Sequence, residues 1–174
     1  DFRWLQQHAA NFDVSVKNKT EQKFMLGIMG PNSRALLSEI SQQHVDDSVL
    51  PYYQSRVFDA NGTNFRANRL SYVGELGYEL YFDRADAKDL FKRMTEAGVK
   101  YSLGFAGFHA MNACRIEKSY KHWGHDIHDS INPYQSGLGF AVDMEKENFI
   151  GKTALVGQKG KQTKRLVSLA LSTD

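Results

Sequence analysis

Three of the six histidines of the chain fall in one short stretch, KHWGHDIHD (121–129). The residues there that could bind a metal are His122, His125, His128, Asp126 and Asp129. Imidazole and carboxylate groups are common zinc ligands. A helix would not bring these histidines onto one ion, because a spacing of three places the first and third about 120° apart. Gly124 disfavours a helix, and a loop leaves convergence open. Since no second ligand pair stands out elsewhere, we predict hydrogen-bonded or solvated histidines and no metal.

Other signatures of catalysis are absent from the sequence. No strand leads into G-x-G-x-x-G, and Gly137-Leu138-Gly139 begins that pattern without completing it. The chain also lacks the G-x-x-x-x-G-K-[ST] phosphate loop, H-E-x-x-H and G-x-S-x-G. The single cysteine, Cys114, falls within a predicted helix among apolar neighbours, and we interpret it as a core thiol. The sequence therefore lacks the motifs of several common nucleotide-binding proteins and hydrolases.

The composition describes a folded chain without a strong electrostatic bias. Its 174 residues are 41% hydrophobic and 12% aromatic, with a net charge of +2. This suits one domain or parts of two, and it lacks the basic footprint of a nucleic-acid binder. The basic run at 159–165 is interpreted as a solvated loop, with a polyanion contact as the alternative. No apolar run reaches the ~20 residues of a membrane span. The opening DFRWLQQHA reads as the inside of a helix, so we expect an internal piece of a longer protein.

The elements that must position any site mix helices and strands. Asn61-Gly62 predicts a tight hairpin between two strands, because both residues tolerate positive φ. Asp83 is a candidate N-cap for the helix that follows it. Predicted helices are 1–12, 33–40, 84–97, 106–120 and 152–156, and predicted strands are 14–17, 23–29, 52–60, 64–73, 77–82, 138–142 and 165–171. This order predicts an α+β fold with antiparallel sheets flanked by helices.

Four stretches together carry a resemblance to a known family. They are LGIMGPNSRALLSEI (26–40), LSYVGELGYELYF (70–82), ACRIEKSYKHWGHDI (113–127) and NPYQSGLGFAVDMEKENFIGKTAL (132–155). In this order they resemble the folate-binding aminomethyltransferase family, which includes the glycine cleavage T-protein. The VGELGYE and HWGHDI forms are most similar to the tetrahydrofolate domain of dimethylglycine and sarcosine dehydrogenases. Each motif alone is weak, but four in register cover nearly the whole chain.

The resemblance implies a three-domain cloverleaf of antiparallel sheets around a central hole that holds the folate. Residues 1–158 would form the later part of the folate-binding core, and 159–174 the truncated start of the C-terminal β-barrel. The family's catalytic Asp would lie upstream of this chain. No position here matches that Asp, so the catalytic residue is unknown.

The resemblance also implies four cofactor-binding residues. Glu79 would accept two hydrogen bonds from the pterin edge, which suits a carboxylate; its strand pattern alone favours a Glu that faces water. Tyr72 would contact the flat folate ring, with a sheet-face tyrosine as the alternative. Arg115 would offer a rigid donor fork, with a surface charge or a pair with a neighbouring acid as the alternative. Trp123 would lie near the folate tail. Asp126 matches a recurrent family acid.

The implied function is capture of a methylene unit on tetrahydrofolate to give 5,10-methylenetetrahydrofolate. The donor would be an N-methylated amino acid, as for dimethylglycine or sarcosine dehydrogenase, and FAD would be bound only by an absent upstream domain. One alternative is a glycine cleavage T-protein, which needs a lipoyl carrier protein. Others are a non-catalytic folate-binding regulatory module and a domain without a ligand. The expected partners are the folate, the amino acid and the missing N-terminal part of the same protein, with no nucleic acid and no membrane. The expected location is the cytoplasm or the mitochondrial matrix.

Overall fold

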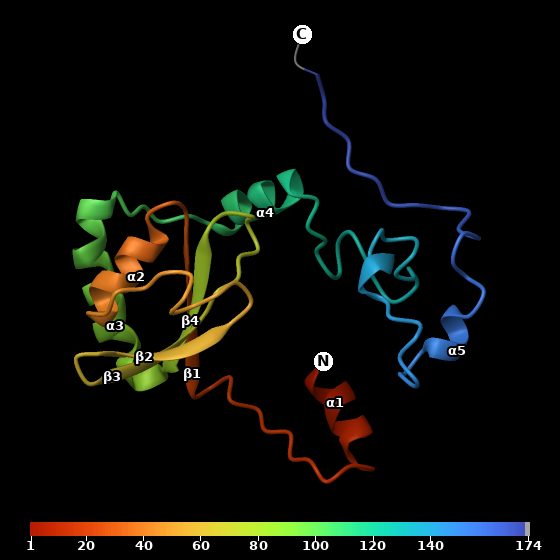
Figure 1. Cartoon of the computed structure of the whole chain (residues 1–174), viewed down its shortest axis with the longest axis horizontal. Helices are drawn as coiled ribbons and strands as arrows, with labels where there is room; N and C mark the ends of the chain where they lie inside the picture. The colour runs from red at the N-terminus through yellow and green to blue at the C-terminus, as the bar shows by residue number, and fades with distance from the viewer. Residues whose placement is uncertain (173–174) are drawn as a thin grey trace. The chain divides into compact units, whose positions relative to one another are not determined.

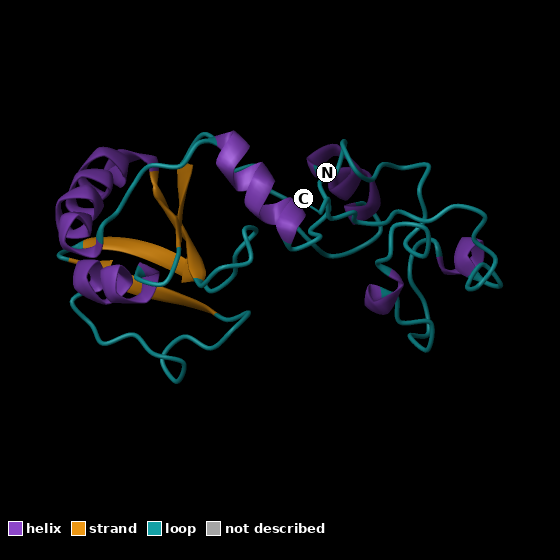
Figure 2. Cartoon of the chain, turned by 90° about the horizontal axis from the view of Figure 1, so that it is seen from above, coloured by secondary structure: helices purple, strands orange, loops and turns teal. Residues whose placement is uncertain are grey.

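The computed structural model describes residues 1–172, and the chain divides after Phe108 into two units (Figure 1). The first unit contains all four strands that the structure assigns within residues 1–172. The second unit, from His109 onward, consists mainly of loops with short helical segments (Figure 2).

A four-stranded antiparallel sheet organises the first unit, in the order β1-β4-β3-β2. Its strands are β1 (Lys23–Met29), β2 (Ser55–Ala60), β3 (Thr63–Asn68) and β4 (Gly77–Asp83). Asn61 and Gly62 join β2 to β3 with φ values of 54° and 87°, so the predicted hairpin is confirmed. The Asp59 carboxylate accepts the Gly62 N–H at 2.8 Å, which stabilises this turn. The hairpin and the antiparallel pairing of β4 between β1 and β3 hold the sheet in register.

Two helices bury one face of this sheet. They are α2 (Ser33–Ser41) and α3 (Ala87–Gly98). The buried apolar side chains of these helices and of the strands form one core, which includes Leu36, Leu37, Leu90, Phe58, Phe65, Tyr78, Leu80 and Phe82. Each large side chain in such a core contributes about 1.5–3 kcal/mol through burial. Because side chains alternate along a strand, the other face of β4 carries the residues between Tyr78, Leu80 and Phe82.

The start of the chain forms a helix but no strand. The predicted first helix is confirmed as α1 (Phe2–Ala9), and none of its residues is buried. The predicted strand at 14–17 is wrong, because this segment has no ladder partner among the described residues. Alternating side chains favour a strand only where a neighbouring edge can satisfy the backbone groups.

The predicted N-cap position of Asp83 is confirmed in part, because this residue precedes the 3-10 turn that leads directly into α3. A 3-10 turn at Arg84–Asp86 separates this residue from α3, and its side chain makes no cap hydrogen bond. Its carboxylate instead lies 2.7 Å from Nζ of Lys23, its register partner on β1. The Asp83 carboxylate therefore forms a cross-strand ion pair instead of a hydrogen bond to the start of the helix.

The second unit contains α4 (Phe108–Glu117), which begins at the last residue of the first unit, and α5 (Lys152–Leu155). The predicted strand at 138–142 is wrong, since Gly139–Ala141 forms a 3-10 turn. The predicted strand at 165–171 is also wrong, because no described segment forms a ladder with it. Its apolar side chains at Val167, Leu169 and Leu171 are exposed. Residues 173 and 174 of the expected barrel start lie outside the described residues.

No helix within residues 1–172 is both long enough and apolar enough to cross a membrane. The mixed helical and antiparallel-sheet class predicted from the sequence is confirmed by the strand pairing and by the helices packed on the sheet.

Candidate functional site

Glu79 lies on the interior strand β4, on the face that the helices do not cover. Its neighbours along the strand, Tyr78 and Leu80, are fully buried in the core, while Glu79 is half-buried. In register it faces Gly27 on β1 and Asn68 on β3. Opposed residues of antiparallel strands share a face. A carboxylate therefore stands on an interior strand opposite a glycine of β1, with the end of the Met29 side chain close to that glycine.

Tyr81 supplies a hydrogen bond to this carboxylate. Its phenol O–H donates to Oε2 of Glu79 at 2.7 Å, since residues two apart on a strand share a face. The bond and partial burial beside the carboxylate raise the pKa of Tyr81 to about 12. Sequence reasoning missed Tyr81, although its spacing from Glu79 on a predicted strand was the signal that would have found it.

Tyr72 lies in the irregular segment between β3 and β4 and is half-buried. The predicted strand at 64–73 ends at Asn68, so this tyrosine is not on the sheet as the sequence indicated. Gly74, with φ of 73°, turns the chain before β4 begins. Tyr72 and Glu79 therefore belong to the same unit but to different kinds of local structure.

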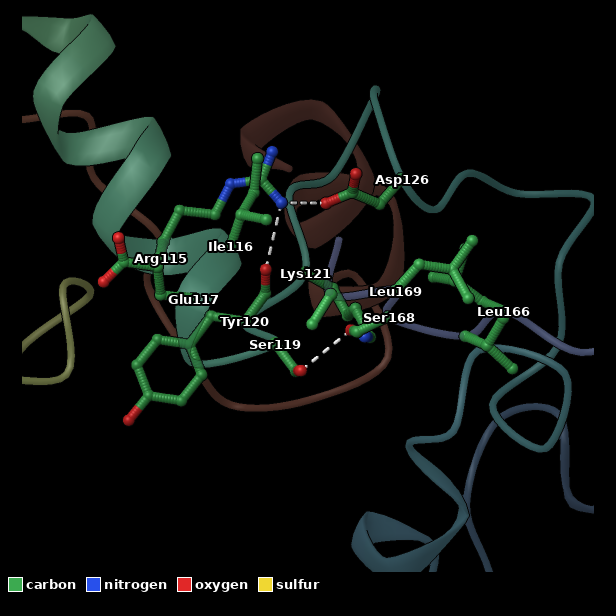
Figure 3. Close-up of a pocket in the computed structure, with 12 residues that line it drawn as sticks. Arg115, Ile116, Glu117, Ser119, Tyr120, Lys121, Asp126, Leu166, Ser168 and Leu169 are labelled. Carbon is green, nitrogen blue, oxygen red and sulfur yellow. Dashed lines mark hydrogen bonds and ion pairs between the residues drawn. The ribbon is translucent and has the colours of Figure 1, made fainter. Parts of the chain in front are cut away.

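Arg115 is buried near the end of α4, with 4% of its surface exposed. Nε donates to Oδ1 of Asn112 at 2.8 Å, and Nη1 donates to the Tyr120 carbonyl at 3.0 Å. Nη1 also forms a close ion pair with Oδ2 of Asp126 (Figure 3). The sequence left a pair with a neighbouring acid open for Arg115, and Asp126 is that acid. Asn112 was missed, although its i, i+3 spacing from Arg115 places it one helical turn away.

The HWGHDI segment folds back on itself around Asp126. Oδ2 of Asp126 accepts the His122 N–H at 2.8 Å, while the Asp126 N–H donates to the His122 carbonyl at 3.0 Å. Burial alone would raise the pKa of Asp126, but the His122 N–H and the Arg115 charge outweigh it and hold the pKa below its usual range. The loop thus presents an ionised carboxylate to the guanidinium.

Two of the three histidines of this loop lie against each other, and the third contacts a serine. The rings of His122 and His125 lie 4.4 Å apart, and Nδ1 of His128 lies 2.9 Å from the Ser130 hydroxyl. Within residues 1–172, no group of three potential ligands is placed to hold a metal ion. Trp123 projects from the same loop with 65% of its surface exposed.

A pocket of about 560 Å³ lies beside Arg115 in the second unit. The end of α4, the following loop and the extended segment 166–170 form its walls, as Figure 3 shows. The hydroxyls of Ser119 and Ser168 lie 2.8 Å apart across it. Charged groups at Arg115 and Asp126 and an apolar wall at 166–170 give the pocket a mixed chemistry. Trp123 is not among the residues that line it.

The four residues predicted to bind the cofactor thus fall into two groups. Tyr72 and Glu79 belong to the first unit, and Arg115 and Trp123 belong to the second. The structure joins Glu79 to Tyr81 and Arg115 to Asp126.

Comparison with known proteins gives the family. The model of the GCVT N-terminal domain matches residues 1–146. The chain belongs to this family. Mitochondrial dimethylglycine dehydrogenase of Homo sapiens is 37% identical over 178 residues, which cover 100% of this chain and 21% of that protein. The aminomethyltransferase of Alkaliphilus oremlandii is 34% identical over 167 residues, which cover 96% of this chain and 45% of that protein.

A solved structure shows the same fold as this member of the GCVT N-terminal domain family. The crystal structure of glycine cleavage system aminomethyltransferase T from Bartonella henselae superposes with a TM-score of 0.74 at 23% identity. The match covers 90% of this chain and 41% of that chain. The chain therefore spans about a fifth of the dimethylglycine dehydrogenase relatives and less than half of the aminomethyltransferases. The family resemblance read from the four sequence motifs is confirmed.

Proposed function

We propose that this chain is the tetrahydrofolate-binding part of an enzyme that transfers one-carbon units. The observation that carries the proposal is the Glu79 carboxylate on the helix-free face of an interior strand, within the part that matches the family. A pterin presents an N–H and an NH₂ group side by side on one edge. A carboxylate can accept both, because each of its oxygens has two acceptor sites.

The other proposed folate contacts are two aromatic side chains and one arginine. Trp123 is well exposed, so its ring is available to pack against a flat ligand. Tyr72 is half-buried and would serve as a second aromatic contact. Arg115 is already bound to Asp126 through Nη1, so it would meet the ligand with the remaining donors of its guanidinium. Within its own unit, each aromatic side chain suits a flat ring, and the remaining donors of Arg115 suit an anionic group.

In this proposal the folate is held so that its reactive nitrogen stands beside the carbon donor. Such placement can lower the barrier by several kcal/mol. The bound tetrahydrofolate supplies the nitrogen atoms that accept the one-carbon unit, and the product is 5,10-methylenetetrahydrofolate. The residues of this chain bind and orient it. The catalytic residue is not assigned to any position here.

The carbon donor in this proposal is an N-methylated amino acid, as the name dimethylglycine dehydrogenase states for relatives that match the whole chain. Such a parent would bind FAD outside this sequence. Residues 1–158 would belong to the folate-binding core and 159–174 to the start of a barrel. The names of these relatives favour the mitochondrial matrix over the cytoplasm.

A glycine cleavage aminomethyltransferase is the second candidate. It is favoured by 34% identity to a named aminomethyltransferase over 96% of the chain, and it would need a lipoyl carrier protein. The folate site is common to both candidates. A module that binds folate without turnover would share the site and lack the transfer activity.

Calorimetric titration of the chain with 5-formyltetrahydrofolate, a stable reduced folate, tests the proposal. Glu79→Ala should weaken binding by at least about tenfold, since a charge-assisted contact is removed. Glu75→Ala is the matched control, because this exposed carboxylate lies in the same VGELGYE motif before the strand. Absence of binding by the wild-type chain contradicts the proposed function. If Glu79→Ala and Glu75→Ala bind the folate equally well, the assignment of Glu79 as the pterin contact is contradicted.

A further inference from the structure

The carboxylate of Glu79 does not stand alone on the helix-free face of β4. The phenol of Tyr81 lies on the same face and donates to Oε2 at 2.7 Å. Both residues are half-buried on a strand that is paired on both sides, so the backbone beneath them is fixed. The hydrogen bond therefore holds the flexible side chain of Glu79 against a tyrosine whose backbone is fixed in the sheet.

A glutamate that must receive two parallel hydrogen bonds needs a defined carboxylate plane. Its side chain has three rotatable bonds, and a bidentate contact forms in only a narrow part of that range. A hydrogen bond to one oxygen restricts the rotation of the plane and leaves the other oxygen available. Each carboxylate oxygen has two acceptor sites, so Oε2 can also accept from a ligand while it is bound to Tyr81.

On the β1 side of Glu79 stands a glycine, and the flexible end of the Met29 side chain lies beside it, since a Cβ at Gly27 would come 3.2 Å from Cε of Met29. Gly27 is the partner of Glu79 on β1 and has no side chain, while Asn68 flanks Glu79 on β3. Tyr81 is flanked by Met25 on β1 and by Arg66 on β3, whose Nη1 donates to the Ser55 hydroxyl at 3.0 Å. A ligand would thus approach the carboxylate from the side of Gly27, away from the phenol, and displace the flexible end of Met29.

We propose that Tyr81 is a positioning residue for Glu79, whose phenol holds the carboxylate plane in the orientation that selects the paired N–H and NH₂ donors of a pterin. This inference rests on the proposed folate site and adds a residue that sets its specificity. The phenol stays protonated at physiological pH, because the pKa of Tyr81 is raised to about 12. It is therefore a permanent donor to the carboxylate.

Tyr81→Phe removes the hydroxyl and keeps the ring. Tyr101→Phe is the matched control, because Tyr101 also donates to a glutamate of the first unit, Oε2 of Glu39 at 3.4 Å. Both variants should keep the far-UV circular dichroism of the wild-type chain. Affinity for 5-formyltetrahydrofolate, measured by calorimetry, should fall about tenfold in Tyr81→Phe and remain unchanged in Tyr101→Phe.

A second ligand separates positioning from loss of structure. A folate analogue in which a methyl group replaces the 2-amino group has lost one of the paired donors. The wild-type chain should prefer the 2-amino ligand strongly, and Tyr81→Phe should reduce this preference several-fold. A variant that was merely less stable would bind both ligands less well and keep their ratio.

The outcomes separate this inference from the function on which it rests. Binding of 5-formyltetrahydrofolate with equal affinity and equal selectivity by wild type and Tyr81→Phe overturns the role of Tyr81 and leaves the folate site standing. An unchanged selectivity ratio with weaker binding of both ligands also overturns it. Failure of the wild-type chain to bind overturns the proposed function and this inference together.

Discussion

Arg115 and Asp126 form an ion pair in which Nη1 of the buried guanidinium donates to Oδ2 of the carboxylate. The same oxygen accepts the His122 N–H, so one atom ties the end of α4 to the loop that follows it. The pair fixes the segment of the second unit that carries three of the predicted family residues, Arg115, Trp123 and Asp126. Its strength can be tested apart from any ligand.

Asp126→Asn should lower the free energy of unfolding by about 2 kcal/mol. Removing one partner of a buried pair leaves an uncompensated charge, and the full cost of ~3–5 kcal/mol is reduced here because Asp126 is partly exposed. Asp129→Asn is the control, since its side chain is 97% exposed. Urea unfolding followed by circular dichroism measures both. Equal midpoints for the two variants would show that the ion pair contributes nothing.

The contribution of Asp126 should depend on pH in a defined direction. Its pKa is held below the usual range, so the stabilisation is complete above the unfolded-state pKa of about 3.9 and is lost as the pH falls through the folded-state pKa. The difference in unfolding free energy between wild type and Asp126→Asn should therefore narrow below about pH 4. Urea titrations between pH 2 and 7, on the order of one per pH unit, follow it. If the difference in unfolding free energy stays constant across this pH range, the ionised Asp126 carboxylate is not the source of the stabilisation.

Ionisation of Tyr81 should report on Glu79 without any folate. Because its pKa is raised to about 12, the stabilisation from this bond is complete below the ordinary tyrosine pKa of about 10 and is lost as the pH rises toward 12. Glu79→Gln removes the neighbouring charge, so one tyrosine should ionise at lower pH than in wild type. Ultraviolet difference absorbance of phenolate measures this shift. Glu75→Gln should leave the titration curve unchanged, and a shift in that variant would point to a general effect of charge.

Gly27→Val should weaken folate binding while the sheet remains intact. A side chain at this position would stand beside Glu79 in the register and occupy the approach to its carboxylate. A Cβ there comes 3.2 Å from Cε of Met29, the flexible end of a side chain that can move. Valine favours strands, so the free energy of unfolding should change by less than about 1 kcal/mol.

The loss of affinity in Gly27→Val should exceed about tenfold, as expected where a steric clash is built against a ligand. Calorimetry with 5-formyltetrahydrofolate measures it. Met25→Val, on the same face of the same strand, is the control for a change of side chain away from Glu79. Unchanged affinity in Gly27→Val would show that the ligand does not approach from this side.

Local patterns predicted the sheet well where a partner strand was close in sequence or strongly apolar. The predicted range 23–29 coincides with β1, and the Asn-Gly pair defines the β2–β3 turn. The same reasoning failed at 165–171, where alternation is clear but no described segment provides a ladder. Asp83 shows a related limit, because its carboxylate pairs with Lys23 on the neighbouring strand and not with the start of the helix.

The sequence by itself determined the family, through four motifs in register, and it is the source of the proposed pterin contacts. It also determined which residues of β4 alternate between the core and the open face, since side-chain direction on a strand follows from position alone. Tertiary structure decided what each side chain contacts. The phenol on Glu79 and the carboxylate on Arg115 depend on the rotamers of two side chains and on the return path of a loop. Those are set by packing and by buried hydrogen bonds, which no local spacing encodes.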